Sequence, residues 1–144
     1  MAKKKPTLTR KAIAASKEFK WFTASAKKWA FRTGVDALFM IQIRPCRPCD
    51  MPIELKDSMA VTMWSSNDTE AAIYFNMQQL KGRSKEVIEQ TARHEIMHLV
   101  TTPLWNEVLR LVGNKGEVYE RLHEVHEGLI DRLAYLFGYL VEPN

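Results

Sequence analysis

Two histidines and a glutamate in one short stretch have the spacing of a metal-dependent hydrolytic site. The stretch is His94-Glu95-Ile96-Met97-His98, and the apolar periodicity around it predicts a helix. Residues four apart lie one turn above each other on a helix, so both imidazoles can present a nitrogen to one Zn²⁺. Glu95 lies about 100° further round the axis. A carboxylate there suits a general base that acts on a metal-activated water.

A catalytic zinc ion takes three protein ligands and keeps one position open. The chain has four histidines, and the predicted C-terminal helix offers Glu127, His123 and His126 as candidates for the third ligand. We favour Glu127, because Asp131 one turn later could accept a hydrogen bond from the far nitrogen of a ligating histidine. His123 and His126 remain alternatives. A solvent-exposed helix face carrying Glu127 and Asp131 is the non-functional alternative.

The segments His94–Val100 and Glu127–Ala134 together resemble the gluzincin pattern of zinc metallopeptidases. The run HEIMHLV…HEGLIDRLAYLFG also resembles predicted metallopeptidases encoded by bacteriophages. This chain departs from the best-known gluzincins at two points. The gap from His98 to Glu127 is longer, at 29 residues, and His126 precedes the glutamate where the pattern has asparagine.

The resemblance implies a zincin-like fold and a zinc-dependent hydrolase, with a polypeptide as the expected substrate. The residues that it implies are His94, His98 and Glu127 for the metal, Glu95 for catalysis, and Asp131 and His123 around the ligands. A further donor to the oxyanion is expected from His123, Tyr119 or Tyr135. The strand before the active-site helix, residues 71–76, is expected to be the sheet edge that holds an extended peptide.

Apolar patterns and turn residues predict an α+β fold with one domain over residues 7–144, after a basic tail at 1–6. The expected strands are 37–43, 59–64 and 71–76, the last two forming a hairpin. The expected helices are an amphipathic one that ends near Gly34, then 87–100 with Ser84 as N-cap, 104–112 and 117–140. Pro103 is expected to end the second helix. The C-terminal helix should bury Val118, Leu122, Val125, Leu129, Leu133, Leu136 and Leu140.

Length and composition bound the class of protein. A chain of 144 residues with 46% apolar and 26% charged residues fits one globular domain and argues against wholesale disorder. No segment approaches the roughly 18 uninterrupted apolar residues of a membrane span. Residues 7–20 carry charges throughout and form no apolar signal core. We therefore expect a cytoplasmic protein, in the host cytoplasm if a phage encodes it.

Positive charge is concentrated near the N-terminus. Residues 1–32 carry ten Lys or Arg against the single Glu18, whereas the remainder carries eleven against sixteen Asp or Glu. Such a segment can contact nucleic acid, although a solvated helix face is the simpler interpretation. The alternative function is therefore a non-catalytic zincin-like binding module that uses this basic arm on nucleic acid or on a phage protein. The sequence leaves the oligomeric state open.

Cys46 and Cys49 form a CxxC pair in a proline-rich segment. The pair supplies two thiolates, so a structural zinc site would need two further ligands from elsewhere. The motif does not open a helix after a strand, which leaves a redox role unsupported. Inert thiols and a second metal site are both open.

Overall fold

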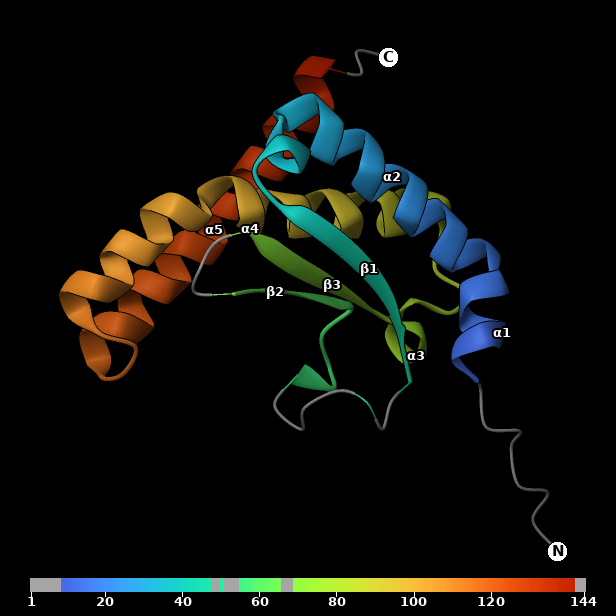
Figure 1. The fold of residues 1–144 in the computed structure, drawn as a ribbon, viewed down its shortest axis with the longest axis horizontal. Coiled ribbons are helices and arrows are strands. Elements are labelled where there is room, and N and C mark those ends of the chain that lie inside the picture. The colour runs from blue at the N-terminus through green and yellow to red at the C-terminus, as the bar shows by residue number, and fades with distance from the viewer. Residues whose placement is uncertain (1–8, 48–49, 51–54, 66–68, 142–144) are drawn as a thin grey trace, which may run out of the picture.

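A computed structural model of the chain describes residues 9–47, 50, 55–65 and 69–141. The basic tail predicted at 1–6 lies outside this range. The described part is α+β, as predicted, with helices on one face of a small mixed sheet (Figure 1). Its elements are α1 (Arg10–Ala15), α2 (Lys17–Thr33), a 3₁₀ helix (Val35–Ala37), β1 (Met40–Cys46), β2 (Ala60–Trp64), β3 (Glu70–Asn76), α3 (Met77–Leu80), α4 (Lys85–Val112) and α5 (Glu117–Val141).

The three strands lie in the order β1-β3-β2. The predicted hairpin is confirmed, because β2 pairs antiparallel with β3, Thr62 opposite Ile73. The first strand, β1, joins the other side of β3 in parallel. The expectation that residues 71–76 form the sheet edge is therefore wrong, since β3 is hydrogen-bonded on both sides. Among the described strands the edges belong to β1 and β2.

The first strand begins three residues later than predicted and continues further. Residues Val35–Ala37 form a 3₁₀ helix, and β1 runs through Pro45 to Cys46. Proline removes one donor from the ladder, which an edge strand tolerates because one of its sides faces no partner strand. Cys46 is buried at the end of this strand. Cys49 lies outside the described residues, so both interpretations of the CxxC pair stay predictions.

The N-terminal helix ends as predicted but is interrupted. Gly34 caps α2 in the left-handed conformation at φ 72°, which glycine adopts without steric cost. The single helix expected before it is wrong, because Ser16 is extended and separates α1 from α2. The Ser16 hydroxyl donates to the Ile13 carbonyl and accepts from the Phe19 amide. A serine that serves both helix ends in this way stabilises the break.

The helix that carries the two spaced histidines does not end at Pro103, which corrects the prediction. Helix α4 continues through Pro103 to Val112. The hydroxyls of Thr101 and Thr102 donate to carbonyls one turn back, at 3.1 Å to Met97 O and 2.9 Å to His98 O. Proline leaves the Leu99 carbonyl without its intrahelical donor. Thr101 and Trp105 both contact His126 of α5, and this packing on either side of Pro103 favours a continuous helix.

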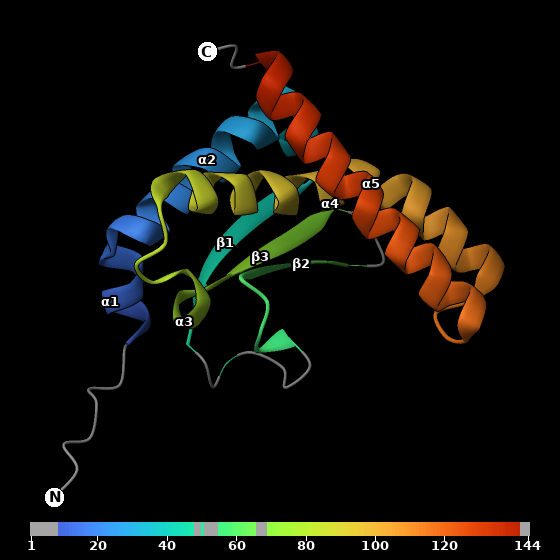
Figure 2. The same ribbon diagram turned by 180° about the vertical axis from the view of Figure 1, so that it is seen from behind.

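The core lies between the sheet and the helices α2 and α4. Phe75 of β3 meets the rings of Phe19 and Phe22 of α2 edge-on at 5.3 Å. Figure 2 shows α4 running across the sheet, with α5 passing along it toward the end of α2. The apolar side chains with no exposed surface are Ile13, Phe22, Ile73, Phe75, Leu80, Ile88, Ala92, Ile96, Met97, Leu99 and Ile130. The buried residues of α4 lie between Ile88 and Trp105, and its last two turns are largely exposed.

Helix α5 buries a different stripe from the one predicted. Val118, Val125, Leu129 and Leu136 are 61%, 69%, 40% and 48% exposed, so the expected core stripe is wrong at these positions. The buried residues of α5 include His126, Ile130 and Ala134. The reason lies in the partner helix, because Trp105 of α4 stacks on the His126 ring at 4.2 Å. This aromatic contact replaces the aliphatic packing that the sequence predicted. Helix α5 is therefore rotated about its axis, with His126 in place of Val125 toward α4.

Candidate metal centre

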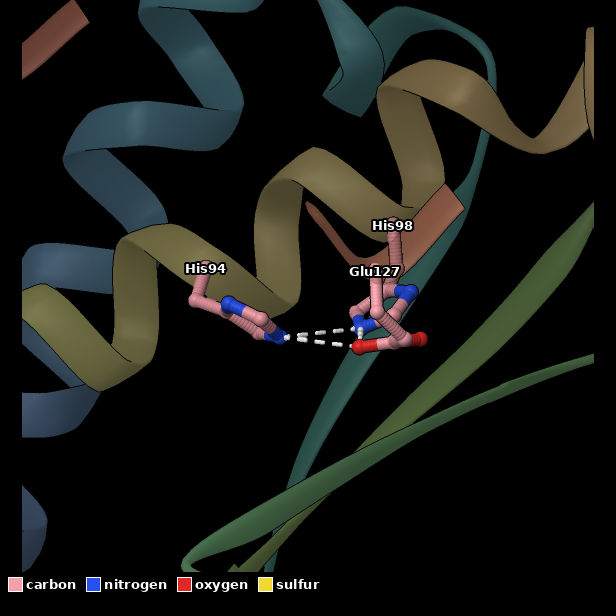
Figure 3. A group of neighbouring side chains, drawn as sticks. All are labelled: His94, His98 and Glu127. Atoms are coloured by element: carbon pink, nitrogen blue, oxygen red, sulfur yellow. Dashed lines mark hydrogen bonds and ion pairs between the residues drawn. The ribbon is translucent and has the colours of Figure 1, made fainter. Parts of the chain in front are cut away.

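Helix α4 holds His94 and His98 on the side that faces α5 (Figure 3). Ser84 caps the helix by accepting from the Val87 amide, as predicted. The two histidines follow each other by one turn, and their Nε2 atoms lie 3.1 Å apart. Their side chains are only 25% and 15% exposed. Two imidazole nitrogens so close, both facing one point, have the arrangement of ligands to a shared cation.

Glu127 approaches the same point from α5. Its Oε2 lies 3.7 Å from His94 Nε2 and 3.8 Å from His98 Nε2. A single position about 2.1 Å from all three atoms satisfies these distances, which matches zinc–nitrogen and zinc–oxygen bond lengths of about 2.0–2.2 Å. Among the described residues, these three form the group that could hold a metal ion. Two histidines and one carboxylate are also a common ligand set of catalytic zinc.

Asp131 orients the His94 ring. The Nδ1–H of His94 donates to Asp131 Oδ1 at 2.8 Å, which is the type of contact that the sequence led us to expect. Because this bond keeps the proton on Nδ1, the lone pair of the neutral ring remains on Nε2, toward the metal position. Asp131 lies one turn after Glu127 on α5, so one helix supplies both a candidate ligand and the group that orients another.

Burial keeps the His98 ring neutral. Desolvation, followed by the nearby rings of His94, His126 and His123, lowers the pKa of His98 to about 3. A neutral ring at physiological pH retains the lone pair that coordination needs. The His98 ring of the metal-free site is thus already in the protonation state that coordination of a cation requires.

Glu95 lies beside the three candidate ligands but is more deeply buried than they are. The residue is 5% exposed, and Thr62 Oγ1 of β2 donates to its Oε2 at 2.6 Å. Burial raises the pKa of Glu95, while the Thr62 hydrogen bond opposes that rise. A carboxylate with a raised pKa takes up a proton more readily than an exposed one, as a general base must.

The remaining two histidines lie outside the group of three. His123 Nε2 is 3.7 Å from Glu127 Oε1, the oxygen that does not face the metal position. The His126 ring is buried, stacked on Trp105 and hydrogen-bonded to Thr101 Oγ1 at 2.9 Å. Geometry therefore favours Glu127 over both rivals as third ligand. His123 lies at the rim, where it could contact a bound molecule.

A groove of about 740 Å³ opens over this cluster. Strand β2 forms one wall and α5 the other, with Glu95 and the two spaced histidines on α4 between them. The residues that line the groove include Met59, Val61, Thr62, Trp64, Gln90, Trp105, His123 and Asp131. Of the expected oxyanion donors, His123 lines this groove. The ring centroid of Tyr119 lies 5.7 Å from that of His123. Tyr135 instead lines a separate cavity with Arg93.

Comparison of the chain with protein-family models, with curated proteins and with solved structures finds no match. In the part of the chain that the structure describes, none of the helices combines the length and apolar character needed to cross a membrane.

Proposed function

We propose that this protein is a zinc-dependent hydrolase that cleaves peptide bonds. The observation that carries the proposal is the convergence of His94, His98 and Glu127 on one point, with the buried Glu95 beside it. A site that only stabilises the fold has no use for a general base next to its ligands. The gluzincin resemblance of the sequence agrees with this set of residues, and we propose a zincin-like fold on the same grounds.

In the proposed reaction, a few residues share metal binding, proton transfer and stabilisation of the oxyanion. His94, His98 and Glu127 would hold zinc, and Asp131 keeps the His94 ring in the required tautomer. Zinc bound there supplies a Lewis acid that acidifies water and polarises a carbonyl. Glu95 accepts the proton of the attacking water and delivers it to the leaving nitrogen. His123, at the rim of the groove, is the best-placed described side chain to donate to the developing oxyanion.

An extended peptide fits the groove better than a compact small molecule. Strand β2 is an edge strand, and its Thr62 reaches Glu95 directly. A substrate that pairs with main-chain groups on the outer edge of β2 would place its backbone along the groove, close to the metal position. We propose that β2 holds the substrate, in place of the strand at 71–76 that the sequence suggested.

Hydrolysis of a quenched fluorescent peptide library by the purified protein tests the proposal. Zinc-loaded protein is expected to cleave a subset of the library, and removal of zinc by a chelator is expected to abolish cleavage. Addition of equimolar Zn²⁺ should restore it, because the same three side chains are available to bind the metal again. A protein that binds zinc at this site but cleaves no member of the library would contradict the assignment.

A second candidate is favoured by the charge of α2. Lys17, Lys20 and Lys27 are exposed on this helix. Its single acidic residue, Glu18, is buried and accepts from the Gly82 amide. This basic face is suited to phosphate groups, which supports a binding module for nucleic acid. Salt-dependent DNA binding lost in a variant with all three lysines changed to glutamate, without any hydrolysis by the parent protein, would favour this function.

A further inference from the structure

Thr62 makes the closest contact to the Glu95 carboxylate. Its Oγ1 lies 2.6 Å from Glu95 Oε2 and 3.1 Å from the main-chain oxygen of the same residue. A hydroxyl has one hydrogen, so the shorter, charge-assisted bond to Oε2 takes it while Glu95 is ionised. The two residues are 33 positions apart and come from a strand and a helix. The contact therefore depends on the fold and has no local cause.

We propose that Thr62 is a positioning residue that fixes which oxygen of Glu95 performs the proton transfer. This inference rests on the proposed function. The hydroxyl of Thr62 holds Oε2, and the main-chain N–H of Thr62 is a second donor to the same carboxylate. In this proposal the hydroxyl bond leaves Oε1 to the attacking water. A glutamate side chain has several rotamers, and a misplacement of about 1 Å in a reacting group can reduce a rate about 100-fold. A hydrogen bond to the carboxylate, at the end of the Glu95 side chain, restricts those rotamers.

The contact suits both halves of the reaction. In the first half, a C–O bond forms to the attacking water and its proton passes to Glu95 Oε1. In the second, that proton passes to the leaving nitrogen as the C–N bond breaks. Oε2 can accept from Thr62 throughout, since an uncharged carboxyl group still has an acceptor oxygen. Glu95 therefore keeps one orientation while it gains and loses the proton.

The position of Thr62 on β2 adds a second consequence. The same edge strand would pair with the substrate backbone, so β2 would hold both the substrate and, through the Thr62 hydroxyl, the end of the Glu95 side chain. A shift of β2 relative to α4 would misalign the base and the substrate together. Precise alignment then depends on the hydroxyl that joins β2 to Glu95.

Two substitutions of Thr62 distinguish the effect of its hydroxyl from the effect of its side-chain shape. Thr62→Val keeps the volume and removes the donor, whereas Thr62→Ser keeps the donor. We expect Thr62→Val to lower kcat about 10–100-fold, as for other groups that orient catalytic residues, with KM changed less than about threefold. Thr62→Ser should recover kcat to within about threefold of the parent. Thr33→Val, which loses a hydroxyl bonded to helix carbonyls away from the groove, is the matched control and should keep the parent kcat.

Two readouts do not depend on hydrolysis. The visible absorption of the Co²⁺-substituted protein should be the same in Thr62→Val and the parent, since Thr62 contacts none of the three candidate ligands. In metal-free protein, the effects of Thr62→Val and Glu95→Ala on the unfolding free energy should be non-additive, because each removes the same contact. Additive effects would show that the two residues do not act together.

Other outcomes overturn the inference or the proposed function separately. A Thr62→Val variant with the parent kcat, or a Thr62→Ser variant as slow as Thr62→Val, would overturn the positioning role. A parent protein that cleaves nothing would overturn the proposed function, and the unfolding cycle would then still decide whether Thr62 holds Glu95.

Discussion

Replacing Glu95 with Gln is expected to lower kcat for peptide cleavage by about 10³-fold while the protein keeps its zinc. Glutamine has nearly the same shape and can still accept from Thr62, but it cannot take a proton from water at neutral pH. The expected loss is within the range of about 10²–10⁴ that a general acid–base group contributes. Steady-state kinetics and metal analysis of the same preparation measure both quantities.

The stability of the same variant should show that the loss of kcat is chemical and is not caused by unfolding. Burial raises the pKa of Glu95 above its ordinary value of 4.5, so the folded metal-free protein holds this carboxylate at a cost above that pH. Glu95→Gln removes the cost and should stabilise metal-free protein at pH 8, by about 1 kcal/mol if it resembles other single stabilising changes. The gain should disappear as the pH falls below 4.5, where Glu95 is protonated in both folded and unfolded chains.

A surface glutamate on the same helix is the control for this substitution. Glu107 pairs with Arg110 at an exposed position of α4, and exposed pairs contribute little to stability. Glu107→Gln should change neither kcat nor the pH dependence of unfolding. If Glu95→Gln hydrolysed peptides at the parent rate, Glu95 could not be the base.

Removing the Glu127 carboxylate is expected to weaken zinc binding more than 100-fold. Loss of a contact behind a ligand already costs about 10–100-fold in affinity, and Glu127→Ala would remove a ligand itself. Asp131→Asn alters the hydrogen bond to Nδ1 of His94. It should weaken zinc binding less, by about 10–100-fold. Competition against a chromophoric chelator at pH 7.5 measures each dissociation constant.

Glu124→Ala is the matched control for this pair of variants. Glu124 is an exposed carboxylate on α5, within one turn of Glu127, and it is not part of the candidate metal group. Its replacement should leave zinc affinity unchanged. Equal affinity in Glu127→Ala and Glu124→Ala would mean that zinc does not bind through Glu127. A stronger effect of His123→Ala would instead support the rival ligand.

Local sequence patterns predicted most of the elements and the three residues that the structure brings together as a candidate metal group. The spacing of His94 and His98 determines a shared helix face, and Asp131 follows Glu127 by one helical turn, so both relations are local properties of a helix. Ser84 and Gly34 mark helix ends through well-known capping preferences. The β2–β3 hairpin follows from two apolar runs on either side of a turn.

The remaining features depend on contacts between distant parts of the chain. The position of β3 at the centre of the sheet depends on β1 joining it in parallel, which no hairpin signal encodes. The continuity of α4 through Pro103 depends on the contacts of Thr101 and Trp105 with α5, and these override the local preference of proline. The rotation of α5 follows from the Trp105–His126 stack. Thr62 is separated from Glu95 by 33 residues, and no pattern in the sequence marks it.

A crystal of zinc-loaded protein, measured on both sides of the zinc absorption edge, tests the central claim most directly. Anomalous difference density is expected at one position, about 2.0–2.2 Å from the Nε2 atoms of His94 and His98 and from Oε2 of Glu127. Glu95 should lie next to this position without coordinating it. Zinc bound elsewhere in the molecule, or no zinc in crystals grown with an equimolar amount, would contradict the account.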